Sequence, residues 1–317
     1  MTGARAFIAA PAGPALTAAE ARFFARARPL GFILFARNVR DPAQLRALTD
    51  ALRTAVGRPA PVLIDQEGGR VARMGPPHWQ AWPPPAEEVG AAGAGAPDAM
   101  RARYRAIGAE LSAAGITVNC APVADLARAH THPVLANRCY GAEPKAVARI
   151  ARAVAAGLAE AGVAPVVKHI PGHGAAREDS HLRTPHVDLH REALELADFA
   201  PFRSLADLPA AMTAHVIYTA IDPDRPATLS PAVIGLIRDG IGFGGLLISD
   251  DISMGALGGP VAARAEAALA AGCDVVLHCN GEMAGMEAIA AACPPLSDIS
   301  AARAARLVAP VPEVSDG

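Results

Sequence analysis

Two residues in the segment IPGHGAAREDSHLRTPH have the types and the spacing of an acid–base pair. Asp179 and His181 are two residues apart, so in extended backbone both side chains point to the same side of the chain. A carboxylate placed there can accept from one imidazole nitrogen, fix the tautomer and raise the basicity of the other nitrogen. Gly172 and Gly174 predict a pliable start to this segment, as a closing loop needs. A surface loop with a solvated Asp and His is the alternative interpretation.

Other polar residues gather where short apolar runs end. They are Asp65, Glu67 and Arg70 after the third run, Asp125 after the fourth, Lys168, His169 and His173 at the fifth, His215 at the sixth, and Ser249, Asp250 and Asp251 at the seventh. In a parallel barrel the carboxyl ends of the strands share one rim, and the chemistry is found there. Five such ends therefore predict one common site.

The elements that must position these residues alternate between β-like and helical patterns. Eight runs, mostly apolar on both parities, read as strands buried on both faces: Ala6–Ala9, Gly31–Phe35, Pro61–Ile64, Thr117–Ala121, Ala164–His169, Ala210–His215, Gly245–Ser249 and Asp274–Leu277. Helical patterns separate most of them: Thr17–Ala27, Pro42–Val56, Asp98–Ala114, Pro144–Ala161, Arg191–Leu205, Ser230–Asp239 and Pro260–Ala271. Thr17 and Glu20 have the spacing of a capping box, and Gly115, Gly162 and Gly272 stand where helices should end.

This order predicts an α/β fold, a (β/α)8 TIM-type barrel, with residues 1–317 as a single domain. A doubly wound open sheet is the alternative, although no GxGxxG motif follows the first strand. We expect a Pro/Gly-rich loop at Gly75–Pro97 and an irregular tail after Pro310.

Composition excludes several classes of protein. The 317 residues are 52% hydrophobic and 19% charged, which is not the composition of a disordered chain. The net charge of −2 does not favour a nucleic-acid partner. No stretch is long and apolar enough for a membrane span, and the N-terminal stretch reads as a strand and loop, not a signal peptide. Five cysteines without a CxxC pair favour a reducing, cytoplasmic location.

Four histidines near the fifth strand, His169, His173, His181 and His186, raise the question of a metal. Their spacing is irregular, and neither HExxH nor a zinc-finger spacing is present. We therefore expect no metal and no other cofactor.

The fragments LIDQEGGRVARM, APVADL, KHIPGHGAAREDSH, MTAHVIY and LLISDDISMGAL resemble the family 3 glycoside hydrolases, and specifically their β-N-acetylglucosaminidases. The resemblance covers about Gly31 to Asn280, and the KH-x-PGHG and DSH motifs are its most specific part. It implies a (β/α)8 barrel, and the length is similar to that of single-domain, peptidoglycan-recycling members. Cys139, where Ser is usual, and His278, where an apolar residue is usual, depart from the pattern outside the catalytic positions.

The resemblance also implies roles. Asp250 matches the nucleophile, His181 the general acid/base and Asp179 the carboxylate that orients it, whereas Asp251 is expected to be structural. Asp65, Lys168 and His169 match residues that bind the sugar ring, and Arg73 and Arg138 match cations that contact the sugar or support the site. A structural pair between Glu67 and Arg70 is left open.

The expected function is that of a retaining exo-β-N-acetylglucosaminidase. The implied substrate is a cytoplasmic muropeptide with terminal GlcNAc β-1,4-linked to anhydro-N-acetylmuramic acid, and we expect a monomer. A broader β-N-acetylhexosaminidase, a phosphorylase and a non-catalytic sugar-binding barrel are the alternatives. A histidine acid/base repels phosphate less than a carboxylate would, which makes phosphorolysis conceivable.

Overall fold

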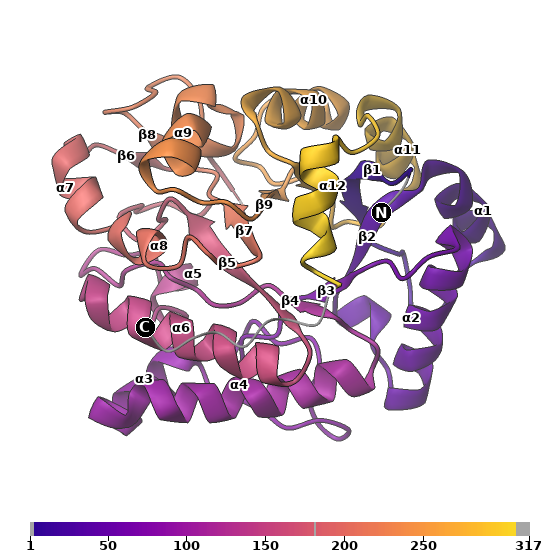
Figure 1. The fold of residues 1–317 in the computed structure, drawn as a ribbon, viewed down its shortest axis with the longest axis horizontal. Coiled ribbons are helices and arrows are strands. Elements are labelled where there is room, and N and C mark those ends of the chain that lie inside the picture. The colour runs from indigo at the N-terminus through magenta and orange to yellow at the C-terminus, as the bar shows by residue number, and fades with distance from the viewer. Residues whose placement is uncertain (1–2, 181, 309–317) are drawn as a thin grey trace.

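A closed barrel of parallel strands organises the chain (Figure 1). The structure is a computed structural model and describes residues 3–180 and 182–308. Eight strands close in the order β1-β10-β9-β7-β5-β4-β3-β2. They are β1 (Arg5–Ala9), β2 (Pro29–Leu34), β3 (Val62–Ile64), β4 (Val118–Asn119), β5 (Ala164–Ile170), β7 (Ala210–Thr213), β9 (Leu246–Asp251) and β10 (Val275–Leu277). Each overlaps one predicted run, which confirms the (β/α)8 barrel, and the closed order excludes the open sheet.

Helices surround the barrel on the outside (Figure 1). They are α1 (Ala18–Ala27), α2 (Pro42–Val56), α3 (Pro85–Ala92), α4 (Ala96–Ala113), α5 (Pro133–Ala136), α6 (Pro144–Glu160), α7 (Arg191–Leu196), α8 (Ala200–Arg203), α9 (Pro231–Gly235), α10 (Val261–Ala271), α11 (Met283–Ala292) and α12 (Asp298–Ala305). Short turns of other helical types lie at η1 (Ala36–Asn38), η2 (Gly93–Gly95), η3 (Ala227–Leu229) and η4 (Leu236–Gly240). The predicted capping box is confirmed: the Glu20 N–H donates to the Thr17 hydroxyl, and the Thr17 N–H donates to the Glu20 carboxylate.

The structure departs from the predicted elements in several places. The predicted helix Arg191–Leu205 is broken into α7 and α8, because Pro201 lacks an N–H and cannot continue a preceding helix. The predicted loop Gly75–Pro97 contains α3, and α11 and α12 follow the last strand. A small parallel pair, β6 (His186–Val187) with β8 (Ile217–Tyr218), joins the loops that follow β5 and β7. The predicted tail after Pro310 lies outside the described residues.

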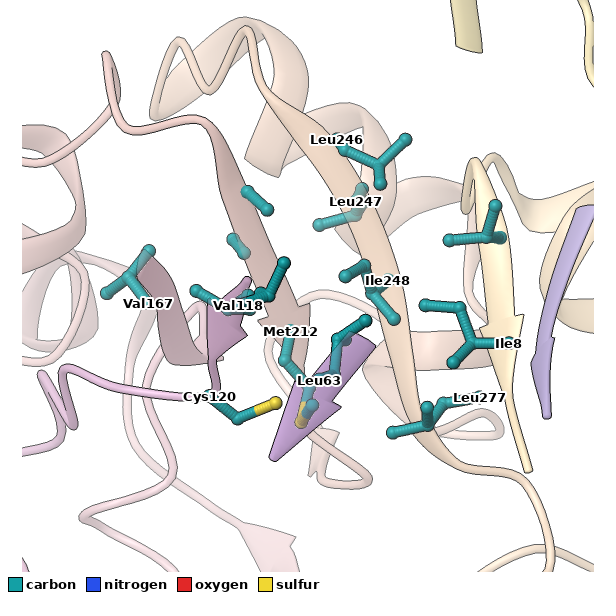
Figure 2. Packing of buried hydrophobic residues seen from close by; sticks show 14 of the residues in the cluster. Ile8, Leu63, Val118, Cys120, Val167, Met212, Leu246, Leu247, Ile248 and Leu277 are labelled. Carbon is teal, nitrogen blue, oxygen red and sulfur yellow. The ribbon is translucent and has the colours of Figure 1, made fainter. Parts of the chain in front are cut away.

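The core fills the barrel and the space between the strands and the helices. All seven residues of β5 are buried, in keeping with a strand covered on both faces. Figure 2 shows part of the core, in which Leu63, Met212 and Leu277 come from three different strands. Met212 and Leu277 also line the pocket at the carboxyl end of the barrel. Core and pocket therefore share a boundary. In the described part of the chain, no helix has the length and apolarity needed to cross a membrane.

Helices α4 and α6 pack closely through a small residue. A Cβ atom added at Gly157 of α6 would lie 2.3 Å from the backbone oxygen of Arg101 in α4. Gly90 in α3 differs, because a Cβ atom there would meet no atom within 4 Å. Neither glycine has a positive φ, so the two positions differ in space and not in backbone strain.

This difference predicts opposite effects of the same substitution. Gly157→Ala should lower the free energy of unfolding by about 1–3 kcal/mol, because the methyl group forces the two helices apart. Gly90→Ala should raise it by up to about 1 kcal/mol, because alanine has the higher helix propensity. Urea titration of both variants checks this, and equal effects would contradict the close helix contact.

Candidate active site

A pocket of about 520 Å³ lies at the carboxyl end of the barrel. Its polar lining is made of Asp65, Arg70, Arg73, Arg138, Lys168, His169, His173, Asp179, Ser180, Asp250 and Asp251. Phe35, Val71, Val134, Leu135, Met212, Met254, Leu277 and Cys279 complete it. Every predicted site residue that the structure describes lines this pocket. His181, the predicted acid/base, lies outside the described residues.

A cluster of buried charges holds one side of the pocket. The Lys168 ammonium contacts two carboxylates, with Nζ 2.7 Å from Asp65 Oδ1 and 2.6 Å from Glu67 Oε1. Arg138 binds Glu67 in a bidentate pair, with both N···O distances 2.8 Å. Arg73 lies at the edge of the cluster, where Nη2 is 3.3 Å from Asp65 Oδ2. Asp65, Arg73, Arg138 and Lys168 therefore lie together, as a common site requires.

Glu67 corrects one expectation. The pairing of Glu67 with Arg70 that was left open is wrong, because the Glu67 carboxylate binds Arg138 and Lys168. Arg70 instead donates to the backbone oxygen of Val134 at the mouth of the pocket. Glu67 is completely buried and does not line the pocket, so it supports the binding residues from behind.

The cluster keeps its members ionised. Burial alone would raise the pKa of the Asp65 carboxyl, but Lys168 and Arg73 outweigh it and hold that pKa well below its ordinary value. Burial also acts to raise the pKa of Glu67, yet Arg138 and Lys168 lower it to about 2. Burial acts to lower the pKa of Lys168, and the two carboxylates raise it above its ordinary range. The pocket therefore offers a fixed carboxylate acceptor and a fixed ammonium donor at neutral pH.

Asp250 and Asp251 end β9 and differ in their contacts. Asp250 lines the pocket, and its Oδ1 accepts from the Asp251 N–H at 2.8 Å. Burial acts to raise the pKa of Asp250, but His215, His169, the Asp251 N–H and Lys168 lower it. Asp250 is therefore an ionised carboxylate facing the pocket, which is the state that a nucleophile needs.

The Asp251 carboxylate binds neighbouring backbone and side-chain groups. Its Oδ1 accepts from the Ser253 hydroxyl at 2.6 Å, from the Ser253 N–H at 3.0 Å and from the Cys279 N–H at 3.2 Å. These contacts tie the turn after β9 to the segment after β10. The geometry agrees with the structural role expected for Asp251.

His215 supports the end of β9, and the sequence marked it only as a polar strand end. Its Nε2 lies 3.0 Å from the Asp251 backbone oxygen, which can only accept, so Nε2 carries the hydrogen. Its Nδ1 lies 2.7 Å from the Thr228 hydroxyl. Burial lowers the pKa of His215, which favours the neutral ring. A neutral histidine therefore holds the backbone next to Asp250.

The loop after β5 begins in close contact with its neighbours. A Cβ atom at Gly172 would lie 2.7 Å from the Asp198 backbone oxygen, and one at Gly174 would lie 2.1 Å from the Leu126 oxygen. Gly172 also has a φ of +140°, which side chains rarely adopt. The structure therefore gives the two glycines a packing role, and the predicted pliability of this loop stays a prediction.

Further along the same loop, His173 Nε2 lies 3.3 Å from the Ser180 hydroxyl, next to Asp179. Both His173 and Ser180 are buried and line the pocket. The segment that carries Asp179 is thus attached to the base of its own loop.

Asp125, in the segment that follows β4, is a buried carboxylate that the sequence marked without a role. Its buried carboxylate lies 2.6 Å from His169 Nδ1 and accepts from the backbone N–H groups of His169 and His173. Burial acts to raise the pKa of Asp125, but His169 and His173 lower it below its ordinary value. The signal for this residue in the sequence was its position in the APVADL fragment, after the fourth apolar run.

Metal ligands do not gather in the part of the chain that the structure describes. Within residues 3–180 and 182–308, no three His, Cys, Asp or Glu side chains converge as a metal site would require.

Comparison with known proteins identifies the family. The model of the glycosyl hydrolase family 3 N-terminal domain matches residues 17–309. The chain belongs to glycoside hydrolase family 3. A beta-hexosaminidase of Alkalilimnicola ehrlichii is 44% identical over 281 residues, which are 84% of this chain and 78% of that protein. These matches make the chain a glycoside hydrolase of the β-N-acetylhexosaminidase type, acting on carbohydrate.

Solved structures similar to this chain agree with the family assignment. NagZ from Neisseria gonorrhoeae, in complex with N-trifluoroacetyl-D-glucosamine, is 34% identical with a TM-score of 0.86 and covers 96% of this chain and 90% of its own. A family 3 β-N-acetylglucosaminidase from Paenibacillus sp. FPU-7 is 33% identical with a TM-score of 0.84, over 96% of this chain and 60% of that one. The non-catalytic barrel is therefore set aside.

His173 generates a pH prediction. Burial, together with His169, lowers the pKa of His173 to about 4, whereas an unfolded chain protonates this ring near its ordinary value of 6.5. The neutral ring therefore contributes stability above pH 6.5, and that contribution is lost as the pH falls through 6.5 towards 4. In His173→Gln, the free energy of unfolding should fall by roughly 3 kcal/mol less than in the wild type between pH 7.5 and pH 4.

Denaturant titration at the two pH values measures this difference. His190→Gln removes an exposed histidine and should leave the pH dependence unchanged. An unaltered acid loss in His173→Gln would show that another group carries it.

Proposed function

We propose that this enzyme is a retaining exo-β-N-acetylglucosaminidase of cytoplasmic cell-wall recycling. It removes terminal, non-reducing GlcNAc from muropeptides in which GlcNAc is β-1,4-linked to anhydro-N-acetylmuramoyl peptides. The observation that carries the proposal is an ionised Asp250 in the same pocket as Asp179, beside the charged cluster around Lys168. The names of the similar proteins support the sugar specificity. We infer further that residues 1–317 act as one catalytic domain, as a monomer and without a cofactor.

The first half of the reaction forms a glycosyl ester. An Asp250 oxygen attacks the anomeric carbon of GlcNAc while the bond to the aglycone oxygen breaks. Protonated His181 donates its proton to that leaving oxygen, and Asp179 holds the imidazole in the required orientation. The aglycone leaves as an alcohol, and GlcNAc is bonded to Asp250 with inverted configuration.

The second half reverses these roles. Neutral His181 takes a proton from water, and the water oxygen attacks the anomeric carbon. The ester bond to Asp250 breaks and returns the carboxylate, and the second inversion restores the β configuration. Imidazole titrates near neutral pH, so one side chain serves as acid and then as base.

The remaining pocket residues hold the sugar. Asp65 accepts hydrogen bonds from sugar hydroxyl groups, and Lys168 and His169 bind the same ring. Arg73 and Arg138 either contact the sugar or support the site, since Arg73 pairs with Asp65 and Arg138 pairs with Glu67 behind it. Because Asp65 and Lys168 are already paired, they need little reorganisation when the sugar binds.

One experiment tests the function directly. Release of p-nitrophenol from its β-GlcNAc glycoside is measured with and without phosphate, and the product is identified. GlcNAc released at a phosphate-independent rate supports hydrolysis, whereas GlcNAc 1-phosphate would establish phosphorolysis. If neither product forms, the proposed function is contradicted.

Asp250→Asn should abolish turnover, because an amide cannot form the glycosyl ester. We expect kcat to fall by about 10⁴-fold or more while the unfolding temperature is retained. Mass spectrometry of wild-type enzyme treated with a 5-fluoro glycosyl donor should locate the sugar on Asp250.

Asp251→Asn is the matched control, because it changes the neighbouring carboxylate. Its partners are Ser253 and Cys279, so this variant should lose stability more than chemistry. A trapped sugar on Asp251, or on no residue, would overturn the assignment.

His181→Ala should lower the rate of hydrolysis most for substrates with poor leaving groups. Protonation carries more of the barrier for a sugar hydroxyl than for a nitrophenol, so hydrolysis of a GlcNAc disaccharide should fall far more than that of the aryl glycoside. With the aryl substrate the glycosyl-enzyme should accumulate, and azide, which needs no general base, should speed turnover and yield a β-glycosyl azide. Equal losses on both substrates without azide rescue would make His181 a structural residue.

A further inference from the structure

Asp125 is a buried carboxylate that none of the roles above uses. Its side chain is completely buried, and it lies behind the pocket and not in its lining. Oδ2 is 2.6 Å from His169 Nδ1, and the His169 N–H donates to both carboxylate oxygens at 3.2 Å. Oδ1 also accepts from the His173 N–H at 2.6 Å. One carboxylate thus joins the segment after β4 to His169, the histidine proposed to bind the sugar, and to the loop that follows it.

These contacts determine where the imidazole carries its hydrogen. Two backbone N–H groups point at the carboxylate, and such donors stabilise the ionised form, which can only accept. The lowered pKa of Asp125 agrees with an ionised group. An acceptor 2.6 Å from Nδ1 requires that Nδ1 be the nitrogen that donates. The other ring nitrogen, Nε2, is then left for the pocket that His169 lines.

We propose that Asp125 is a positioning residue for sugar binding: it fixes His169 as the Nδ1–H tautomer and presents Nε2 to a hydroxyl group of the bound sugar. This inference rests on the proposed function. In the neutral ring Nε2 accepts from that hydroxyl, and in the protonated ring it donates, so the sugar contact is kept while Nδ1 stays bound to Asp125.

The neighbouring residue, Lys168, is oriented in the same way. Lys168 is oriented by Asp65 and Glu67 from one side, as His169 is oriented by Asp125 from another. Two consecutive side chains are therefore aimed at one pocket by separate carboxylates. The bond from the His173 N–H to Asp125 additionally attaches the start of the loop whose later part carries Asp179.

The tautomer can be measured without any activity. In wild-type enzyme with ¹⁵N-labelled histidine, long-range ¹H–¹⁵N correlation spectra distinguish a protonated ring nitrogen from an unprotonated one. His169→Gln identifies the signals of His169 among the ten histidines of the chain. At a pH where His169 is neutral we expect a protonated Nδ1 and an unprotonated Nε2. The opposite assignment would overturn the proposal.

Asp125→Asn tests the consequence for binding. In wild-type enzyme the N–H groups of His169 and His173 and the Nδ1 of His169 contact the two carboxylate oxygens of Asp125. The asparagine amide has only one oxygen, so either its NH₂ group faces a donor or the His169 ring changes its tautomer. We expect the Kd for GlcNAc, measured by calorimetry, to rise roughly 10- to 100-fold, by analogy with the carboxylates that orient metal-binding histidines. KM for the aryl glycoside should rise with it, and the His169 tautomer signals should change or become mixed.

Asp274→Asn is the matched control. Asp274 is also a buried aspartate that accepts from a backbone N–H, that of Leu247, and from Arg238 and Arg303, but it does not line the pocket. This variant should be destabilised while its Kd for GlcNAc and its His169 signals stay those of the wild type. An Asp125→Asn protein with wild-type GlcNAc affinity would refute the inference.

The two proposals can fail separately. If wild-type enzyme neither binds GlcNAc nor cleaves its aryl glycoside, the proposed function fails and with it the sugar-binding role of Asp125. If the enzyme is active but Nε2 carries the hydrogen, only the inference on Asp125 fails. If the Asp125→Asn variant does not fold, the tautomer of His169 measured in wild-type enzyme still tests the inference.

Discussion

Charged side chains held out of water at the carboxyl end of the barrel must be paired there, and this constraint organises the site. Lys168 and Glu67 are almost wholly inaccessible to solvent, and Arg138 is nearly so. Leaving one partner of such a pair unmatched costs about 3–5 kcal/mol, so the pairs require the geometry that brings them together. They join β3, β5 and the segment after α5, and the residues proposed to bind the sugar are thereby part of what stabilises the barrel.

The apolar core gives this cluster a rigid base. Met212 and Leu277 contact the packed interior on one side and the pocket on the other, so the pocket wall has the density of a protein core. At the end of β9, His215 binds the backbone oxygen of Asp251, and the Asp251 N–H donates to the Asp250 carboxylate, so the backbone directly after Asp250 is held in place. The carboxylate proposed to react is thus attached to a strand and not to a loop, which favours precise placement.

The barrel could be predicted because each strand is apolar on both parities, a pattern that few other folds require. The common rim followed, since the carboxyl ends of parallel strands meet. The pairing of Glu67 could not be predicted, because Arg138 lies 71 residues further along the chain. The break between α7 and α8 could have been predicted, because Pro201 follows it in the sequence. Spacing alone left Asp179 and His181 open to a surface-loop interpretation, and family motifs were needed to assign roles.

The two close-packed glycines at the start of the loop after β5 bear on how this enzyme can diversify. A side chain at Gly172 or Gly174 would collide with backbone atoms of Asp198 or Leu126, so substitution of either glycine would disturb the first turn of the loop. Further along the loop, Arg177, Leu182 and Arg183 are exposed, and Leu182 exposes 78% of its surface. Natural variation and library design that seek a new aglycone should therefore be directed to these exposed positions, with the glycine anchor, Asp179 and His181 left unchanged.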